Sequence, residues 1–261
     1  MIGKLTILSL LALAPPAFAA DESLTSGAWQ TLRTEFYGSR EFGEVDETLM
    51  SMAAPPATPD PTATPVKLHF GQQAAGKVKQ VRIIIDHNPA PIAATMQLAQ
   101  GVPIEDIEMR LRIDRATNVR AIAEFADGGL EMRSVWVKAG GGCSAPPQAG
   151  GDGKIGDIRF RTTADLKSLQ MSIHHPNNSG FQIDPVSGEP IPPHFVSHIR
   201  LRSGDKVVLE ADTGISLSQN PTIRIASEEK FPAPLTLEAV DSKQAQFTAT
   251  WDGAPTRAGG G

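Results

Sequence analysis

Cysteine is the side chain with the greatest scope for chemistry in this chain, and it occurs once. Cys143 follows Gly140, Gly141 and Gly142 in the stretch VWVKAGGGCSAPPQAGGDGK. With a single cysteine no internal disulfide can form, so the residue is a free reactive thiol, one half of an intermolecular bond, or an incidental linker residue. An enzyme's nucleophilic cysteine needs a fixed base and a positive surrounding. Neither is evident here, so the pattern predicts an attachment point that a partner protein activates.

The glycines before the cysteine predict how it is displayed. Glycine has no Cβ, so Gly140, Gly141 and Gly142 make a thin and conformationally permissive chain. Five extended residues from Lys138 reach about 15 Å, which would place a thiol inside a narrow channel of another protein. We therefore expect residues 139–154 to form an exposed swinging arm on which almost nothing packs.

Histidines are the second candidate for chemistry. His174 and His175 are adjacent, so on a strand they point to opposite faces. His194 and His198 are four apart, which on a strand separates them by about 13 Å. These spacings favour turn and interface histidines, and we predict no metal site and no catalytic residues. No G-x-S-x-G, H-E-x-x-H or P-loop motif occurs, so we expect no enzyme.

The N-terminus carries an export signal. Residues 1–19 contain Lys4, an apolar run and the A-x-A cleavage pattern Ala17-Phe18-Ala19, which together predict a signal peptide and a periplasmic protein. The apolar run is too short for a bilayer, which needs about 20 residues. The formal net charge of −5 argues against nucleic acid and anionic lipid as partners.

The rest of the chain divides by composition. Residues 20–52 are expected to form a short amphipathic helix with Ser26 as its N-cap, docked on a domain. Residues 53–65 hold five prolines and predict an extended spacer. Residues 253–261 are expected to be a disordered tail.

Two sets of short strands follow the spacer, over 66–138 and 155–252. In the first set, Met109 alternates with charged neighbours, and Asp127-Gly128-Gly129 is a hairpin signal. No helical pattern of a dozen residues separates the strands, which disfavours a parallel sheet. The pattern predicts an all-β protein with two antiparallel sandwiches in tandem, joined by the glycine-rich segment.

Several motifs carry a family resemblance across residues 66–252. The stretches NPAPIAATMQL and EMRLRIDRATNVRAIAEFADGGLEMRSVWVKAGGGC resemble the SoxY subunit of a sulfur-oxidation carrier. The stretch MSIHHPNNSGFQIDPVSGEPIPPHFVSHIRL resembles its SoxZ subunit. A single chain with both halves is similar to the fused SoxYZ-like carriers associated with quinoprotein dehydrogenases.

The resemblance implies two immunoglobulin-like sandwiches without intrinsic catalysis. It implies that Cys143 holds sulfur intermediates covalently, with no other cofactor, and that c-type cytochromes, a sulfur dehydrogenase and a thiol sulfatase-like hydrolase are partners. The family's arm ends freely after GGCGG, whereas Ser144-Ala145-Pro146-Pro147 follow here. Another sulfur or one-carbon cargo in a quinoprotein dehydrogenase system therefore stays open. Two other readings also stay open: a non-covalent accessory or chaperone subunit of a periplasmic quinoprotein (PQQ) dehydrogenase, and metal delivery through the histidines.

Overall fold

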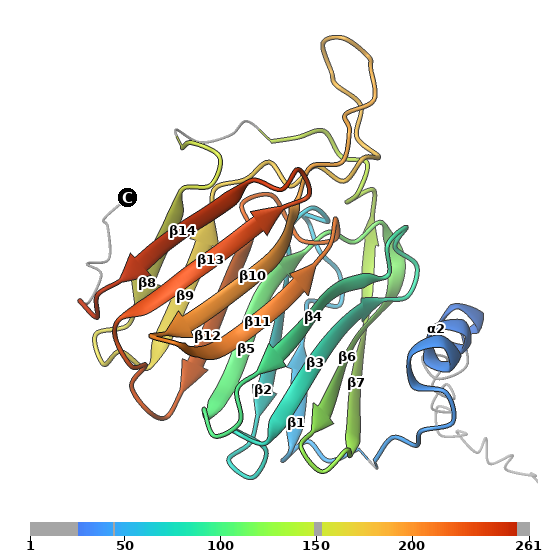
Figure 1. The fold of residues 1–261 in the computed structure, drawn as a ribbon. Coiled ribbons are helices and arrows are strands. Elements are labelled where there is room, and N and C mark those ends of the chain that lie inside the picture. The colour runs from blue at the N-terminus through green and yellow to red at the C-terminus, as the bar shows by residue number, and fades with distance from the viewer. Residues whose placement is uncertain (1–25, 44, 149–152, 255–261) are drawn as a thin grey trace, which may run out of the picture. The chain divides into compact units, whose positions relative to one another are not determined.

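The fold is nearly all β (Figure 1). The computed structural model describes residues 26–43, 45–148 and 153–254, so the predicted signal peptide and most of the predicted tail lie outside the described residues. Helix α2 spans Gly27–Tyr37, and the Ser26 side chain accepts a hydrogen bond from Trp29 N, which confirms the predicted N-cap. The helix belongs to one compact unit and the chain from Ser39 onward to another. Docking of the helix stays a prediction.

Within the described residues, fourteen strands form two antiparallel sheets. One has the order β1-β2-β5-β12-β9-β8 and the other has the order β14-β13-β10-β11-β4-β3-β6-β7. The strands are β1 (Met50–Ala53), β2 (Thr64–Phe70), β3 (Val78–Ile85), β4 (Ile92–Leu98), β5 (Ile104–Leu111), β6 (Arg115–Phe125), β7 (Leu130–Gly140), β8 (Ile158–Thr162), β9 (Ser168–Ile173), β10 (Val196–Ser203), β11 (Lys206–Thr213), β12 (Thr222–Ser227), β13 (Leu235–Asp241) and β14 (Gln246–Trp251).

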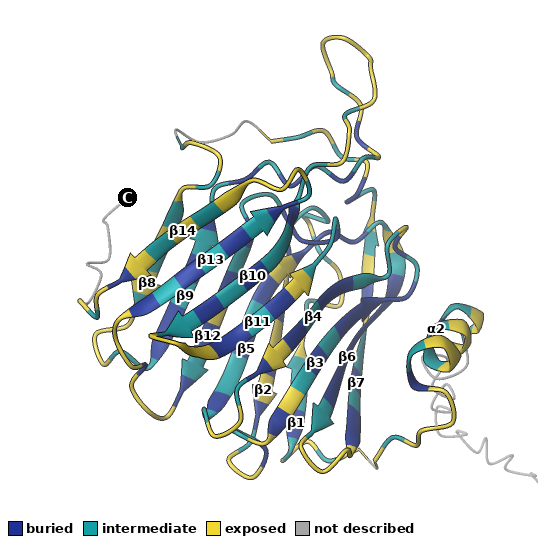
Figure 2. Cartoon of the chain, viewed as in Figure 1, coloured by how far each residue is buried: buried dark blue, intermediate teal, exposed yellow. Residues whose placement is uncertain are grey.

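The predicted alternation holds on some strands but not on β6, where residues 117–123 are all buried. Along β2 buried and exposed residues alternate without a break, as the colours of Figure 2 show. Met109, on β5, is buried as expected. The predicted hairpin joins β6 to β7, and Gly128 has φ +87° in the turn, a conformation that L residues rarely adopt.

Both sheets run through the two halves of the chain without interruption. Strand β5 of the first half pairs with β12 of the second, with Met109 opposite Ile223. Strand β4 pairs with β11, with Leu98 opposite Leu209. The edge strands of each half thus satisfy one another's backbone groups. The glycine-rich segment was predicted to be the connection between two separate bodies, and strand pairing joins them instead.

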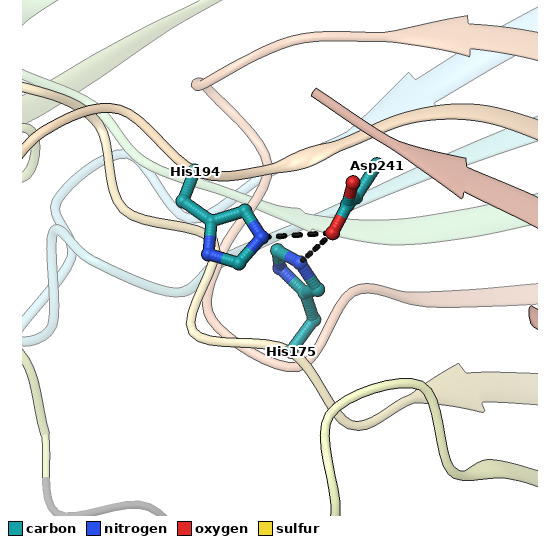
Figure 3. Close-up of side chains that lie close together, drawn as sticks. All are labelled: His175, His194 and Asp241. Atoms are coloured by element: carbon teal, nitrogen blue, oxygen red, sulfur yellow. Dashed lines mark hydrogen bonds and ion pairs between the residues drawn. The ribbon is translucent and has the colours of Figure 1, made fainter. Parts of the chain in front are cut away.

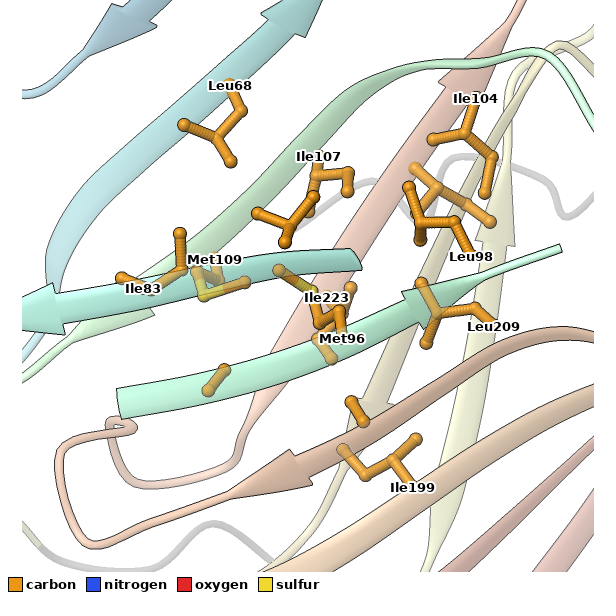
Figure 4. Close-up of a cluster of buried hydrophobic side chains, with 14 of the residues drawn as sticks. Leu68, Ile83, Met96, Leu98, Ile104, Ile107, Met109, Ile199, Leu209 and Ile223 are labelled. Atoms are coloured by element: carbon orange, nitrogen blue, oxygen red, sulfur yellow. The ribbon is translucent and has the colours of Figure 1, made fainter. Parts of the chain in front are cut away.

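The interior follows the same continuity. Figure 4 shows one apolar cluster to which both halves contribute side chains. Met96 and Ile107 come from the first half, and Ile199 and Ile223 come from the second. Apolar burial contributes about 25 cal/mol per Å², so this shared interior adds to the stability of both halves together.

The proline-rich segment is extended but is not a free spacer. Thr58 N donates to Lys138 O over 3.1 Å, and Lys138 N donates to Pro56 O over 2.8 Å. These bonds hold the segment along β7 as a short parallel bridge at Ala57. Proline cannot donate through its nitrogen, yet its carbonyl still accepts, which is how this segment pairs. Strand β1, within the segment predicted to be helical, was not anticipated.

Candidate functional site

The only thiol lies where the two halves meet. Directly after β7, Gly141 N donates to Asp114 O over 2.6 Å and Gly142 N donates to Ile113 O over 3.1 Å. These bonds fold the chain back onto the end of β5, and the Cys143 side chain is 0% exposed. The expectation of an exposed thiol with nothing packed on it is therefore wrong for this conformation. Backbone hydrogen bonds, which composition alone does not reveal, hold the segment down.

The glycines permit close packing here. A Cβ on Gly142 would lie 2.2 Å from Pro61 O and 2.6 Å from Ile113 O, distances that real Cβ atoms do not show. Gly141 has φ +77°, which favours glycine. Gly140 ends β7 and has open space around its Cβ position. In this state the tract lets three backbone segments approach one another, and its role as a moving arm stays a prediction.

Residues of the second half hold the cysteine segment from the other side. The Ser179 hydroxyl donates to Cys143 O, and Gln182 Nε2 donates to Ala145 O over 3.0 Å. Gln182 Oε1 in turn accepts from Ser179 N over 3.0 Å, so these two residues support each other. Together Ser179 and Gln182 form a clasp, the name used below for this pair.

Burial makes the thiol a weak acid. It raises the pKa of Cys143 to about 11, and the Asp114 carboxylate adds to the increase, while the Arg112 guanidinium acts in the opposite direction. A thiol with that pKa is thiolate in only about one molecule in ten thousand at pH 7. In this conformation Cys143 is therefore a poor nucleophile.

Arg112 is the charged group that bridges the halves beside the thiol. It follows β5, is 2% exposed, and donates from Nε to Leu217 O over 3.2 Å and from Nη2 to Asn177 O over 2.9 Å. The pKa of Arg112 lies below its usual value because burial lowers it. The nearby Asp60 carboxylate, and Cys143 in its thiolate form, would offset only part of that decrease. In the described part of the chain its hydrogen-bond partners are neutral carbonyls, so its charge has no paired carboxylate.

Two asparagine turns, one from each half, build the surroundings of Arg112. Asn88 Nδ2 donates to Arg112 O over 2.8 Å and to Ser216 Oγ over 3.0 Å, while its Oδ1 accepts from Asp114 N over 2.9 Å. Asn177 has φ +47° and donates from Nδ2 to Leu217 O over 3.0 Å. Both turns follow strands through a His and Pro sequence, and the fold brings them to one place.

The histidines form a second cluster, drawn in Figure 3. His194 Nε2 lies 2.8 Å and His175 Nε2 lies 3.5 Å from Asp241 Oδ2, and the two rings meet edge to face at 4.5 Å between centroids. His198 lies elsewhere, with its Nδ1 2.8 Å from Asp212 Oδ1. The histidine spacings in the sequence do not predict this cluster, because its third member, Asp241, lies at the end of β13.

Burial and hydrogen bonds set the charges of this cluster. Burial lowers the pKa of His175 to about 4, and the neighbouring His194 adds to the decrease. Burial acts to raise the pKa of Asp241, but hydrogen bonds from His194 and from the backbone N–H groups of Ala245 and Lys243 outweigh it, so that pKa is lowered. An ionised Asp241 therefore lies beside a neutral His175 and accepts hydrogen bonds from His194 and the backbone.

The same three side chains could in principle hold a metal ion, since their ligand atoms lie within 4.8 Å of one another. However, Asn177 N donates to His175 Nδ1 over 3.1 Å, so the neutral ring carries its proton on Nε2. That is the atom facing Asp241, and a metal ligand must be unprotonated. The cluster is better explained as a hydrogen-bonded tie between strands.

The fold and site define an all-β chain of two fused halves with one thiol at their junction. Comparison with family models assigns both halves. Residues 33–143 match sulfur oxidation protein SoxY, and residues 158–252 match sulphur oxidation protein SoxZ. The chain belongs to these families as a SoxY domain followed by a SoxZ domain, and the SoxY match ends on Cys143.

Solved structures add descriptive likenesses. The sulfur carrier protein SoxY from Chlorobium limicola f thiosulfatophilum is 18% identical, with 43% of this chain and 91% of that chain covered and a TM-score of 0.36. A beta-glycosidase from Bacteroides vulgatus is 8% identical over 80% of this chain and 25% of that chain, with a TM-score of 0.26. No curated protein matches. Within the described ranges, no helix has the length and apolar character needed to cross a bilayer.

Sequence reasoning found Cys143 but missed most of its neighbours. Arg112 and the clasp residues were not predicted as site residues from the sequence. The one usable signal was the R-x-R spacing of Arg110 and Arg112, which on a strand puts two cations on the same side.

Proposed function

We propose that this protein is an exported, non-enzymatic carrier that holds a sulfur intermediate covalently on Cys143 and presents it to partner enzymes. The observation that carries the proposal is the end of the SoxY match on the chain's only cysteine. The tandem SoxY and SoxZ halves support it, because residues of both halves surround that cysteine. Export to the periplasm rests on the signal pattern of residues 1–19.

The proposed attachment is an oxidative one. The Cys143 thiol and the outer sulfur of thiosulfate form an S–S bond, which releases one proton and two electrons and leaves a cysteine S-thiosulfonate. The electrons go to a pair of one-electron acceptors of the c-type haem class on a partner protein. No group of this chain needs to change its own oxidation state other than the cysteine sulfur.

Attachment requires the site to open. The buried thiol is almost fully protonated at neutral pH, and no partner could reach it in this conformation. Opening breaks the clasp bonds to Cys143 O and Ala145 O and the two bonds from Gly141 and Gly142 to the end of β5. Each such bond contributes about 1 kcal/mol net, so a docking partner could supply the cost. The conformation described here is the closed state of the carrier.

Intact-mass measurement tests the proposal. Protein purified from its native host without reductant should contain a sulfur-bearing adduct on the peptide with Cys143, and reduction should remove it. Cys143→Ala, which removes the thiol without burying a hydroxyl, should show no adduct while keeping its fold. Unmodified protein throughout, in cells oxidising thiosulfate or a related sulfur compound, would contradict a covalent carrier.

Burial of the thiol favours a second candidate, a non-covalent accessory subunit of a periplasmic quinoprotein dehydrogenase. In that case Cys143 is a structural residue, and the protein binds the dehydrogenase through the surfaces of its two halves. The two candidates differ in one readout. Cells with Cys143→Ala grow normally on the dehydrogenase substrate if the protein is an accessory subunit, and fail if the adduct is essential.

A further inference from the structure

A polar cavity of about 260 Å³ lies beside the cysteine segment. Arg110 and Arg112 line it from β5 and its continuation, and Pro146 and Gln148 line it from the chain just after Cys143. The second half closes it with hydroxyl and amide side chains, which include Ser218 and Gln219. The cavity therefore shares one wall residue, Arg112, with the surroundings of the thiol.

The two arginines lack carboxylate partners. Within the described residues, neither Arg110 nor Arg112 has a carboxylate at ion-pair distance, although most other arginines of the β body do. Arg112 is more than nine-tenths buried, and its Nη1 donates no hydrogen bond to the described protein. A buried cation without a carboxylate at ion-pair distance is costly, so a bound anion would stabilise this arrangement.

One carboxylate also faces the cavity and opposes an anion there. Asp60 lines it, but Asp60 Oδ1 already accepts from Thr62 N over 2.9 Å and from the Thr62 hydroxyl over 2.5 Å. Two guanidinium groups therefore face one carboxylate whose charge is partly satisfied. Gln148 Nε2 and Gln219 Nε2, which donate over 3.4 Å and 3.2 Å to protein oxygens, supply further donors around the space.

We propose that this cavity is a binding site for a small sulfur oxyanion of the thiosulfate or sulfate class, held by Arg110 and Arg112. Guanidinium groups bind tetrahedral oxyanions through paired N–H donors, and the strand spacing of two places both groups on one side. The site rests on the proposed function for the choice of a sulfur oxyanion. It would hold a free anion close to the thiol that later carries it.

Calorimetric titration of the full chain tests this site. Sodium thiosulfate and sodium sulfate are titrated into Cys143→Ala protein, at an ionic strength held constant with chloride, so that no covalent step can occur. We expect saturable binding that weakens by about tenfold or more in Arg110→Gln, because one charge-assisted contact is lost. Arg161→Gln, which removes an exposed arginine of β8 without an ion pair in the described structure, should bind as before.

Arg112 supplies a second variant. Arg112→Lys keeps the charge but loses the planar fork of donors, so binding should weaken while the unfolding transition stays cooperative. If this variant fails to fold, the Arg110→Gln comparison still decides. Absence of thiosulfate and sulfate binding, or binding that Arg110→Gln and Arg161→Gln leave equally unchanged, would overturn the site.

The outcome is separable from that of the carrier proposal. Arginine-dependent binding in a protein that never shows an adduct would support the site and contradict covalent carriage. An adduct on Cys143 in a protein that binds no free oxyanion would support carriage and overturn the site.

Discussion

The cysteine site and the histidine cluster both bury charged groups where strands end, yet they differ in how those charges are met. The buried carboxylate of Asp241 accepts from His194, lies beside His175 and takes two backbone N–H groups. The buried guanidinium of Arg112 meets only neutral carbonyls. A buried charge that is met by close hydrogen bonds stabilises the fold, whereas a buried charge with no carboxylate at ion-pair distance, beside a cavity and a thiol, favours the binding of a ligand.

The largest effect should come from removing the satisfied charge. Asp241→Ala leaves His194 without its acceptor, removes the carboxylate beside His175 and breaks the bonds from Lys243 N and Ala245 N, so we expect a loss of about 3 kcal/mol or more in the free energy of unfolding. Urea denaturation measures it. Asp212→Ala, which removes the exposed partner of His198, should change stability by about 0.5 kcal/mol or less. Equal losses of unfolding free energy in the two variants would mean that the histidine cluster does not stabilise the fold.

The histidine cluster should also make stability depend on pH. His175 has a folded pKa of about 4 against 6.5 in the unfolded chain, so between these values the unfolded state binds more protons. Stability is then full above pH 6.5 and falls as the pH drops toward 4, by an amount on the order of 2–3 kcal/mol. Asp241, whose pKa lies below 3.8, adds a further loss below that pH.

Denaturation curves across this pH range measure the slope. His175→Gln should flatten it between pH 6.5 and 4, because the group that resists protonation is gone. A slope that persists unchanged in this variant would assign the effect to other groups.

At the cysteine site, close packing of the glycine tract should matter at one position and not at another. Gly142→Ala forces a Cβ against Pro61 O and Ile113 O, and we expect it to cost about 2 kcal/mol. Gly140→Ala meets nothing within 4 Å and should stay within about 0.5 kcal/mol. Thermal unfolding compares the two variants. Equal stability would show that the tract is free in solution, as the sequence alone indicated.

The smallest effect concerns access to the thiol. Native protein should react slowly with a disulfide reagent such as DTNB, and Gln182→Ala should speed the reaction about tenfold, because one bond of the clasp to Ala145 O is lost. The rates of DTNB labelling are measured at constant pH. Gln97→Ala, which breaks an exposed amide pair with Gln80, is the matched control and should react like the unaltered protein. Fast labelling of the unaltered protein would contradict the closed state.

Several local elements of the fold could be predicted because their signals depend on neighbouring residues. Alternation at Met109, the hairpin at Gly128 and the N-cap at Ser26 each depend on a few neighbouring residues, and the structure confirms all three. The motifs of both halves likewise pointed to the SoxY and SoxZ families, which the family models match. Cys143 stood out by being alone.

The surroundings of that cysteine could not be predicted, since they come from distant parts of the chain. Ser179 and Gln182 lie 36 and 39 positions beyond it, and Asp241 lies 47 positions beyond His194. Periodicity cannot reveal that β5 pairs with β12, and that pairing carries residues of the second half to the thiol.

The amino-acid sequence by itself determined the β class, the two halves, the single thiol and the glycines next to it, because composition and short-range alternation encode these features. Only the tertiary structure decided that the thiol is buried, that Gly142 allows backbone segments to pack closely, and that Arg112 is buried without a carboxylate at ion-pair distance. These three features depend on which strands pair with one another. Hydrogen bonding between edges far apart in the chain is a property of the folded molecule and not of any local stretch.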